Sequence, residues 1–97
     1  MLTGKQKRYL RSLANPLEAI YQVGKGGVNP AFIQGISEAL EARELIKISV
    51  LKNCAEEKAV LADTIAKQTN SDVVQIIGST IILYKESEEK KKIELPK

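Results

Sequence analysis

The stretch EAIYQVGKGGVNPAFIQGISEALEARELIKISVL, residues 18–51, decides the fold. Its first part, residues 18–23, is rich in β-formers and predicts a strand, after which three glycines occur within Gly24–Gly27. An asparagine–proline pair then supplies an N-cap and a proline at the first helical position. Apolar residues at helical spacing predict a helix over 30–43, and a period-two alternation predicts a strand over 44–51. The stretch is therefore a β-α-β unit, which favours parallel strands.

The chain beyond this unit predicts one more helix and a hairpin. Apolar residues at helical spacing indicate a helix over about 53–68. Runs of β-branched residues at 73–77 and 81–84 predict two strands. Gly78-Ser79 between them suits a two-residue turn with glycine first, so we expect the strands to be antiparallel.

The chain before the unit predicts an amphipathic helix over residues 3–14. Thr3 and Gln6 have the spacing of a capping box, and Asn15-Pro16 ends the helix. The apolar face comprises Leu2, Tyr9, Leu10 and Leu13. The basic residues are Lys7, Arg8 and Arg11 on the opposite side and Lys5 on its flank. The helix therefore has one face to pack and one basic face to present.

The element order is α-β-α-β-α-β-β, which predicts a single compact α/β domain over residues 1–97. We expect a mixed four-stranded sheet in which crossovers join parallel strands and the closing hairpin adds an antiparallel strand. The elements should pack as a two-layer or three-layer sandwich. Residues 86–97 form a charged tail with four acidic and four basic residues. We expect this tail to be mobile as far as Ile93.

The composition limits the kinds of catalytic and metal site that the protein can form. The 97 residues include no histidine and a single cysteine, Cys54. Without imidazole there is no Ser-His or Cys-His pair, and one cysteine cannot build a zinc site of the usual kind. We therefore expect a protein that is not an enzyme, with no metal and no cofactor. The longest apolar runs are four residues, whereas a membrane-spanning helix needs about 20. An unpaired cysteine and the lack of a basic-then-apolar leader predict a cytoplasmic protein.

Positive charge is concentrated in the N-terminal third of the chain. Residues 1–30 contain five basic residues and one acidic residue, whereas residues 31–85 contain six basic and seven acidic residues. Such a concentration is typical of a surface that binds a polyanion, although a solvated helix face produces the same pattern. Lys47 and Lys52 either extend this basic surface or simply face water.

The loop Gly24-Lys25-Gly26-Gly27 lies between a predicted strand and a predicted helix N-terminus, where backbone N–H groups can bind phosphate. Its spacing does not match a P-loop, and Asn29 stands where a dinucleotide fingerprint has its third glycine. A third interpretation is a Gly-x-x-Gly loop of the kind that clamps a nucleic-acid backbone in KH domains, and a plain tight turn is the fourth. Because the loop closely follows the basic helix, we favour the nucleic-acid interpretation.

Aromatic residues are few. Tyr9 and Phe32 lie in apolar stripes and are predicted to pack in the core. Tyr21 lies on the predicted strand before the glycine loop, and its sequence context does not distinguish core packing from stacking on a base. Cys54 is predicted to be a small structural side chain without special reactivity.

Six segments, in their order and spacing, resemble the CRM domain (chloroplast RNA splicing and ribosome maturation) in its short stand-alone bacterial form. They are LTGKQKRYLRSLA at 2–14, VGKGGV at 23–28, ELIKI at 44–48, VVQIIG at 73–78, TIILY at 80–84 and IELPK at 93–97. The resemblance implies an RNA-binding domain similar in fold to the C-terminal domain of initiation factor 3. It also implies an association with precursors of the large ribosomal subunit. The glycine loop of that family matches Gly24, Lys25, Gly26 and Gly27.

These observations predict a non-catalytic, monomeric RNA-binding protein that acts in ribosome assembly, with ribosomal RNA or a large-subunit precursor as its partner. We expect neither a membrane nor a small-molecule substrate as a partner. The predicted RNA-binding residues are Lys5, Lys7, Arg8, Arg11, Gly24, Lys25, Gly26 and Gly27. The alternative is a protein-interaction module of ribosomal or other ribonucleoprotein particles that docks through its sheet or tail.

Overall fold

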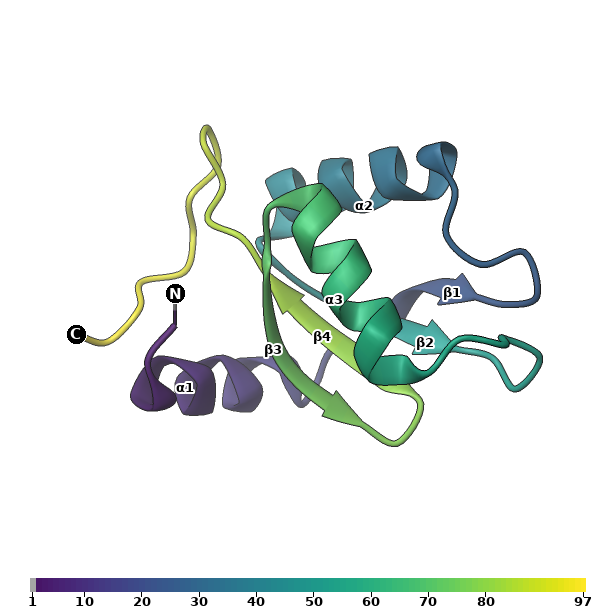
Figure 1. The fold of residues 1–97 in the computed structure, drawn as a ribbon. Helices are drawn as coiled ribbons and strands as arrows, with labels where there is room; N and C mark the ends of the chain where they lie inside the picture. Colours follow the sequence, from purple (N-terminus) through teal and green to yellow (C-terminus); the bar gives the residue numbers. More distant parts are fainter. Residues whose placement is uncertain (1) are drawn as a thin grey trace.

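The computed structural model describes residues 2–97, and these form three helices and four strands (Figure 1). In chain order the elements are α1 (Gly4–Ala14), β1 (Ala19–Val23), α2 (Pro30–Arg43), β2 (Leu45–Val50), α3 (Lys58–Thr69), β3 (Asp72–Ile77) and β4 (Thr80–Tyr84). This is the predicted element order. The third helix begins at Lys58 rather than near residue 53, because the polar stretch before it forms a loop.

The four strands form one mixed sheet in the order β1-β2-β4-β3. β1 and β2 are parallel, and β4 pairs antiparallel with both β2 and β3. The mixed four-stranded sheet is thereby confirmed. The crossovers join strands that run parallel, as expected, but only β1 and β2 are neighbours, because β4 lies between β2 and β3. Residues Ile81–Tyr84 of β4 are buried on both faces, which suits a central strand, whereas β3 ends in two exposed isoleucines and suits an edge.

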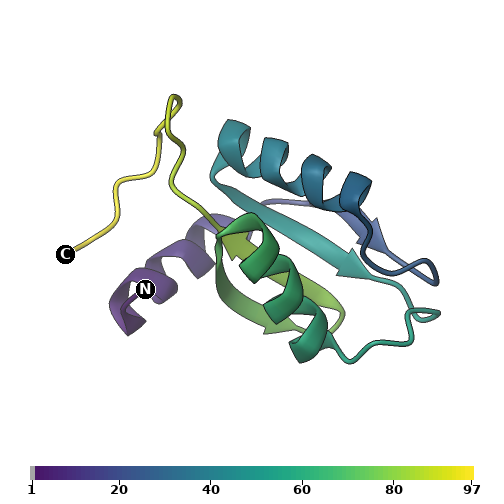
Figure 2. The ribbon, with the colours of Figure 1, turned by 45° about the horizontal axis from the view of Figure 1, so that its top comes forward.

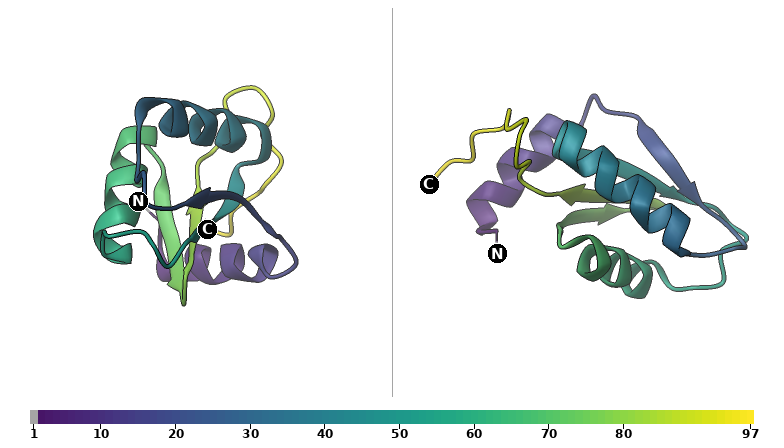
Figure 3. Two further views of the ribbon diagram at one scale, coloured as in Figure 1. Left: turned by 90° about the vertical axis from the view of Figure 1, so that its right-hand side faces the viewer. Right: turned by 90° about the horizontal axis from the view of Figure 1, so that it is seen from above.

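Helices cover both faces of the sheet, so the molecule has three layers (Figures 2 and 3). α2 and α3 pack on one face, over a core that includes Ile36, Leu40, Ile48, Leu61, Ile65 and Ile81. α1 packs on the opposite face, over a smaller core made of Leu10, Ala14, Leu45, Val74, Ile82 and Tyr84. Alternation along the strands produces both sets, since neighbouring residues of β4 such as Ile81 and Ile82 point to opposite faces.

The face that α1 covers remains partly open, because α1 lies under only one end of the sheet (Figure 1). Beyond α1, one row of side chains crosses all four strands on this face: Gln22, Ser49, Thr80 and Ile77. None of the four is buried, and Ile77 is 53% exposed. We call this row the open strip.

Two carboxylates hold the tail after β4: that of Glu41 in α2 and that of Glu44, the C-cap residue of α2. Glu44 is fully buried, and its carboxylate accepts the backbone N–H groups of Ser87 (2.8 Å), Lys92 (2.7 Å) and Ile93 (2.8 Å). Glu41 accepts the Ser87 hydroxyl at 2.7 Å and two further backbone N–H groups. Ile93 and Leu95 then pack against the core under α1. The expectation of a tail that is mobile before Ile93 is therefore wrong.

Within residues 2–97, no helix is both long enough and apolar enough to cross a bilayer.

Candidate nucleic-acid interface

The glycine loop forms a tight turn at the carboxyl end of β1. The N–H of Gly27 donates to the carbonyl of Gly24 at 3.0 Å, which closes the turn around Lys25 and Gly26. Both of these central residues are exposed. The turn leads directly into α2, whose N-cap Asn29 accepts the N–H of Phe32 at 2.8 Å. The loop therefore presents an exposed backbone and one cation beside a capped helix N-terminus, as the sequence predicted.

The three glycines differ in what the structure requires of them. A Cβ on Gly24 would lie 3.1 Å from Asn53 Oδ1 and 3.2 Å from Leu51 Cδ1, so close packing favours glycine there. Gly27 has a φ of +65°, which disfavours any residue with a Cβ. Gly26 has neither constraint, because its φ is not positive and a Cβ would meet nothing within 4 Å. The fold therefore does not require glycine at position 26. Close approach of a ligand to the backbone there would require it.

A second loop, residues 51–57, lies beside the glycine loop at the same end of the molecule (Figure 2). The N–H of Leu51 donates to the carbonyl of Val23 at 2.8 Å, which joins the two loops at their bases. A hollow of about 430 Å³ opens here, and its lining includes Lys52, Lys58, Glu56 and the hydroxyl residues Ser49 and Ser79. Lys52 and Lys58 thus lie at the glycine-loop end.

Sequence reasoning left Lys52 undecided and missed Lys58. A usable signal was present, because the carboxyl ends of parallel neighbours meet at the same edge of a sheet. The predicted pairing of the strands at 18–23 and 44–51 therefore already placed the loops after them side by side.

The basic residues of α1 divide into two pairs. Lys5 and Arg8 are exposed, and Lys5 Nζ donates to the backbone carbonyl of Lys97 at 3.3 Å. Lys7 and Arg11 are half-buried, so they do not lie opposite the packed face as predicted. Lys7 lines a hollow of about 490 Å³ together with Asp63 and Asp72.

None of these four cations forms an ion pair within the described residues. The two ion pairs in this part of the chain, Lys67–Asp63 at 3.0 Å and Lys91–Glu86 at 3.1 Å, lie elsewhere. Leaving a surface cation unpaired costs little free energy of folding. An unpaired cation also attracts a polyanion more strongly than a cation neutralised by an ion pair.

The structure does not bring α1 and the glycine loop together. α1 lies under one end of the sheet, and the glycine loop projects from the other end (Figures 1 and 3). The longest dimension of the molecule, 38 Å, runs along this direction. The eight predicted residues therefore form two regions: the α1 region (Lys5, Lys7, Arg8, Arg11) and the loop region (Gly24–Gly27). The open strip lies on the face of the sheet between them.

Among the remaining candidates, Tyr21, Lys47 and Cys54 have structural roles, whereas Tyr9 has none in the core. Tyr21 packs edge to face against Phe32, with ring centroids 5.9 Å apart, so it belongs to the core rather than to a stacking surface. Tyr9 is 38% exposed, so the prediction that it packs in the core is wrong. Lys47 Nζ donates to the carbonyl of Leu17 at 2.9 Å. Cys54 is half-buried against the larger core.

A metal centre has no candidate in the described part of the chain, where no three His, Cys, Asp or Glu residues cluster suitably.

Comparisons with known proteins show the family of the chain. Residues 2–85 match the family model of the CRS1 / YhbY (CRM) domain. The "Probable RNA-binding protein YqeI" of Bacillus subtilis is 64% identical over 96 residues, which cover 99% of this chain and 100% of that protein. An "RNA-binding protein" of Haemophilus influenzae is 36% identical over 96 residues, covering 99% of this chain and 96% of that protein.

A solved structure extends the comparison to the fold. The solution structure of SAV1595 from Staphylococcus aureus, described as a putative RNA binding protein, is 56% identical, with a TM-score of 0.83 over 99% of this chain and 100% of that one. The family match spans all four strands, the glycine loop and all three helices. The chain belongs to the CRS1 / YhbY (CRM) domain family.

Proposed function

We propose that this protein binds RNA without catalysing a reaction, and that it acts in the cytoplasm in the assembly of the large ribosomal subunit. Two relatives that align along nearly their whole length are named as RNA-binding proteins, and the CRM family supports the same function. The ribosomal role follows from the resemblance to the stand-alone bacterial members of that family. The protein acts as a monomer in this proposal.

The exposed Lys25–Gly26 pair is the observation that carries the proposal. Gly26 is not required by backbone conformation or by packing, and Lys25 stands beside it without a counter-charge within the described residues. A phosphate that approaches the turn would meet backbone N–H groups at Gly26 and the Lys25 ammonium. A side chain at position 26 would block this approach.

RNA binding in this proposal uses both regions. The loop region binds one phosphate closely, with Lys52 and Lys58 at the same end, and the α1 region supplies a second set of cations. Because the two regions lie at opposite ends of the sheet, one RNA segment reaches both only if it passes along the open strip. Serine and threonine hydroxyls on this strip are able to donate to phosphate or ribose oxygens.

The experiment is a double substitution in the loop, Lys25→Asp with Gly26→Asp. Both positions are exposed and Gly26 has open space, so we expect the fold to survive, as measured by circular dichroism. We expect RNA affinity to fall at least about tenfold, because two carboxylates repel the phosphate. A control with the same change in net charge, Lys90→Asp with Gln68→Glu, should bind RNA nearly as the native protein does. Equal affinity in a folded loop variant would mean that the loop is only a turn.

The ribosomal role has its own test. Crosslinking in cells, followed by sequencing of the bound RNA, should enrich sequences from the large-subunit ribosomal RNA, and the loop variant should lose that enrichment. Enrichment of other RNA classes would contradict the assembly role and leave RNA binding intact. Binding to protein components that persists at high salt and in the loop variant would favour the protein-interaction module instead.

A further inference from the structure

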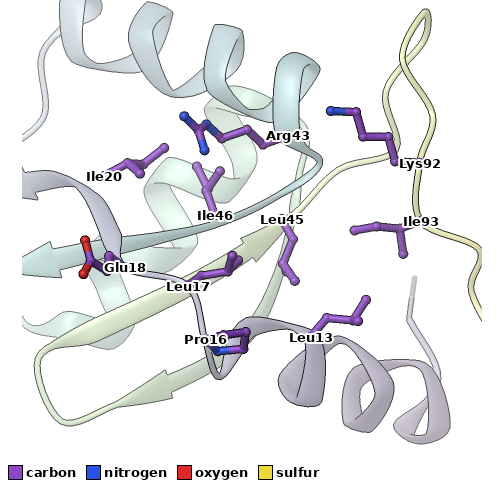
Figure 4. A pocket seen from close by; sticks show the side chains of 10 residues that line it. All are labelled: Leu13, Pro16, Leu17, Glu18, Ile20, Arg43, Leu45, Ile46, Lys92 and Ile93. Carbon is purple, nitrogen blue, oxygen red and sulfur yellow. The ribbon is translucent and has the colours of Figure 1, made fainter.

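A groove of about 530 Å³ opens at the end of the molecule away from the glycine loop (Figure 4). It lies between the carboxyl end of α1, the start of β1, the carboxyl end of α2 and the tail. Its aliphatic lining comprises Leu13, Pro16, Leu17, Ile20, Leu45, Ile46 and Ile93. Its charged lining comprises Glu18, Arg43 and Lys92. We call it the edge groove, and it includes none of the eight predicted RNA-binding residues.

The register of the sheet explains why a groove lies here. Ala19, the first residue of β1, pairs with Lys47, whereas β2 already begins at Leu45. The first two residues of β2 therefore lack a neighbouring strand on the β1 side, and they line the groove. β1 is itself an edge strand, with one side of its backbone unpaired. The groove is thus a gap at the edge of the sheet, of a size that binding sites commonly have.

Exposed aliphatic side chains border this gap. Leu17 is 38% exposed and Ile20 is 39% exposed, and both point into the groove (Figure 4). Proteins usually cover an unpaired sheet edge, and they usually bury large aliphatic side chains. Here both are exposed to solvent at the same place.

The charges define the chemistry of the occupant. Arg43 and Lys92 stand at one rim, and neither forms an ion pair within the described residues (Figure 4). Glu18 stands at the opposite end of the groove from Lys92. An occupant that matches this pattern has aliphatic side chains in its centre and carboxylates along the rim that Arg43 and Lys92 form (Figure 4).

The lining argues against a nucleobase. Seven of the ten lining residues are aliphatic and none carries an aromatic ring on which a base could stack, so the three charged groups able to read a base edge, Glu18, Arg43 and Lys92, have no stacking surface beside them. Aliphatic walls instead match leucine, isoleucine or valine side chains, and the unpaired backbone of an edge strand matches an extended peptide.

We propose that the edge groove binds an extended segment of a partner protein that carries aliphatic residues followed by acidic residues. The aliphatic side chains pack on Leu17, Ile20 and Leu45, and the carboxylates bind Arg43 and Lys92. The segment lies along the edge of β1 and adds main-chain hydrogen bonds to the sheet. This site does not depend on the proposed RNA function, because its lining includes none of the eight predicted RNA-binding residues.

The test titrates the full-length protein with a short synthetic peptide of alternating leucine and threonine that ends in two glutamates. We expect backbone amide NMR signals of Ile20, Arg43 and Ile46 to shift saturably. A peptide ending in two lysines should not shift them. Replacing Arg43→Gln with Lys92→Gln should weaken binding of the acidic peptide at least about tenfold while leaving RNA affinity unchanged. The matched variant Lys25→Gln with Lys52→Gln should do the reverse.

Each contrary result overturns the proposal. Equal affinity for the acidic and the basic peptide, or for the native protein and the Arg43–Lys92 variant, would remove the charge recognition. Shifts of the same amides that depend only on protein concentration would make the occupant a second copy of this chain. Shifts of these amides produced by RNA oligonucleotides would make the groove part of the nucleic-acid interface.

Discussion

Glu44 shows how one residue fixes the end of a helix and the path of the tail together. Its φ of +67° is one that residues with a Cβ rarely adopt, and its ψ of −40° places it outside the left-handed helical region that commonly ends a helix. Its carboxylate is fully buried, yet it accepts three backbone N–H groups from the tail. These charge-assisted hydrogen bonds offset both the strained backbone and the burial of the charge.

The first prediction concerns the acid sensitivity of this contact. Burial by itself raises the pKa of Glu44, but the N–H groups of Ser87, Lys92 and Ile93 outweigh it and hold the pKa below its ordinary value of 4.5. A depressed folded-state pKa contributes stability above the unfolded value, and that stability is lost as the pH falls through the folded value. We therefore expect the tail to stay docked at neutral pH and to detach on acidification below 4.5. Amide NMR signals of Ser87 and Ile93 report this directly.

Glu44→Gln separates the charge from the shape of the side chain. We expect it to destabilise the protein at neutral pH by about 2 kcal/mol, the scale of a lost hydrogen bond to a charged group. The loss should shrink as the pH falls. Glu38→Gln, at an exposed position of the same helix, is the matched control and should change little. A Glu44→Gln protein as stable as the native one at neutral pH would contradict the role of the carboxylate.

The second prediction separates the two roles of glycine in the loop. Gly26→Ala should leave stability within about 0.5 kcal/mol of the native value, because nothing lies within 4 Å of the new Cβ. It should nevertheless weaken RNA binding by crowding the backbone that approaches phosphate. Gly27→Ala should cost about 1 kcal/mol of stability, because its φ of +65° is strained for alanine. Thermal unfolding and RNA titration on both variants check this, and an equal stability loss at both positions would contradict it.

Local signals explain which elements were predictable. Thr3 and Gln6 form the expected capping box, and the predicted helix over 30–43 matches α2 because the asparagine–proline pair marks its start. The hairpin of β3 and β4 also forms around Gly78 and Ser79, as its turn residues indicated. The order of β3 and β4 in the sheet was not predictable locally, since it depends on which strand is buried on both faces. The docked tail depends on hydrogen bonds between residues more than 40 positions apart.

The third prediction concerns α1 as an element. Replacing its four basic residues by glutamine should weaken RNA binding and leave the fold intact. The structure adds a difference between the two pairs: Lys5→Gln with Arg8→Gln changes exposed positions and should alter stability by no more than about 0.5 kcal/mol for each change. Lys7→Gln with Arg11→Gln changes half-buried positions whose side-chain stems pack, so its stability loss should be larger. Thermal unfolding of both pairs, with RNA titration, measures this, and a larger loss for the exposed pair would contradict the burial pattern.

At the scale of the whole molecule, the sequence predicts a set of RNA-binding residues but not their arrangement in space. Arg11 and Lys25 are close in sequence, and their charges add in any count along the chain. β1 separates them, however, because it runs from the α1 side toward the opposite end of the sheet (Figure 1). The same topology places Lys58, far away in sequence, at the glycine-loop end. Charge patterning along a chain therefore predicts a polyanion-binding surface without giving its position on the fold.

The last prediction follows from this separation. If four or five phosphates are neutralised, log K should fall with log salt at a slope of about −3 to −4 for an RNA long enough to contact both regions. An RNA too short to span the 38 Å axis reaches only one region, so its slope should be about half as steep. For the long RNA, the free-energy losses of the Lys25–Gly26 and α1 variants should add, because distant sites act independently. For the short RNA, only one of the two variants should matter. Affinities measured over a salt series with both RNAs test this. Equal slopes for the two lengths, or equal losses from both variants on the short RNA, would mean that the protein binds RNA through a single patch.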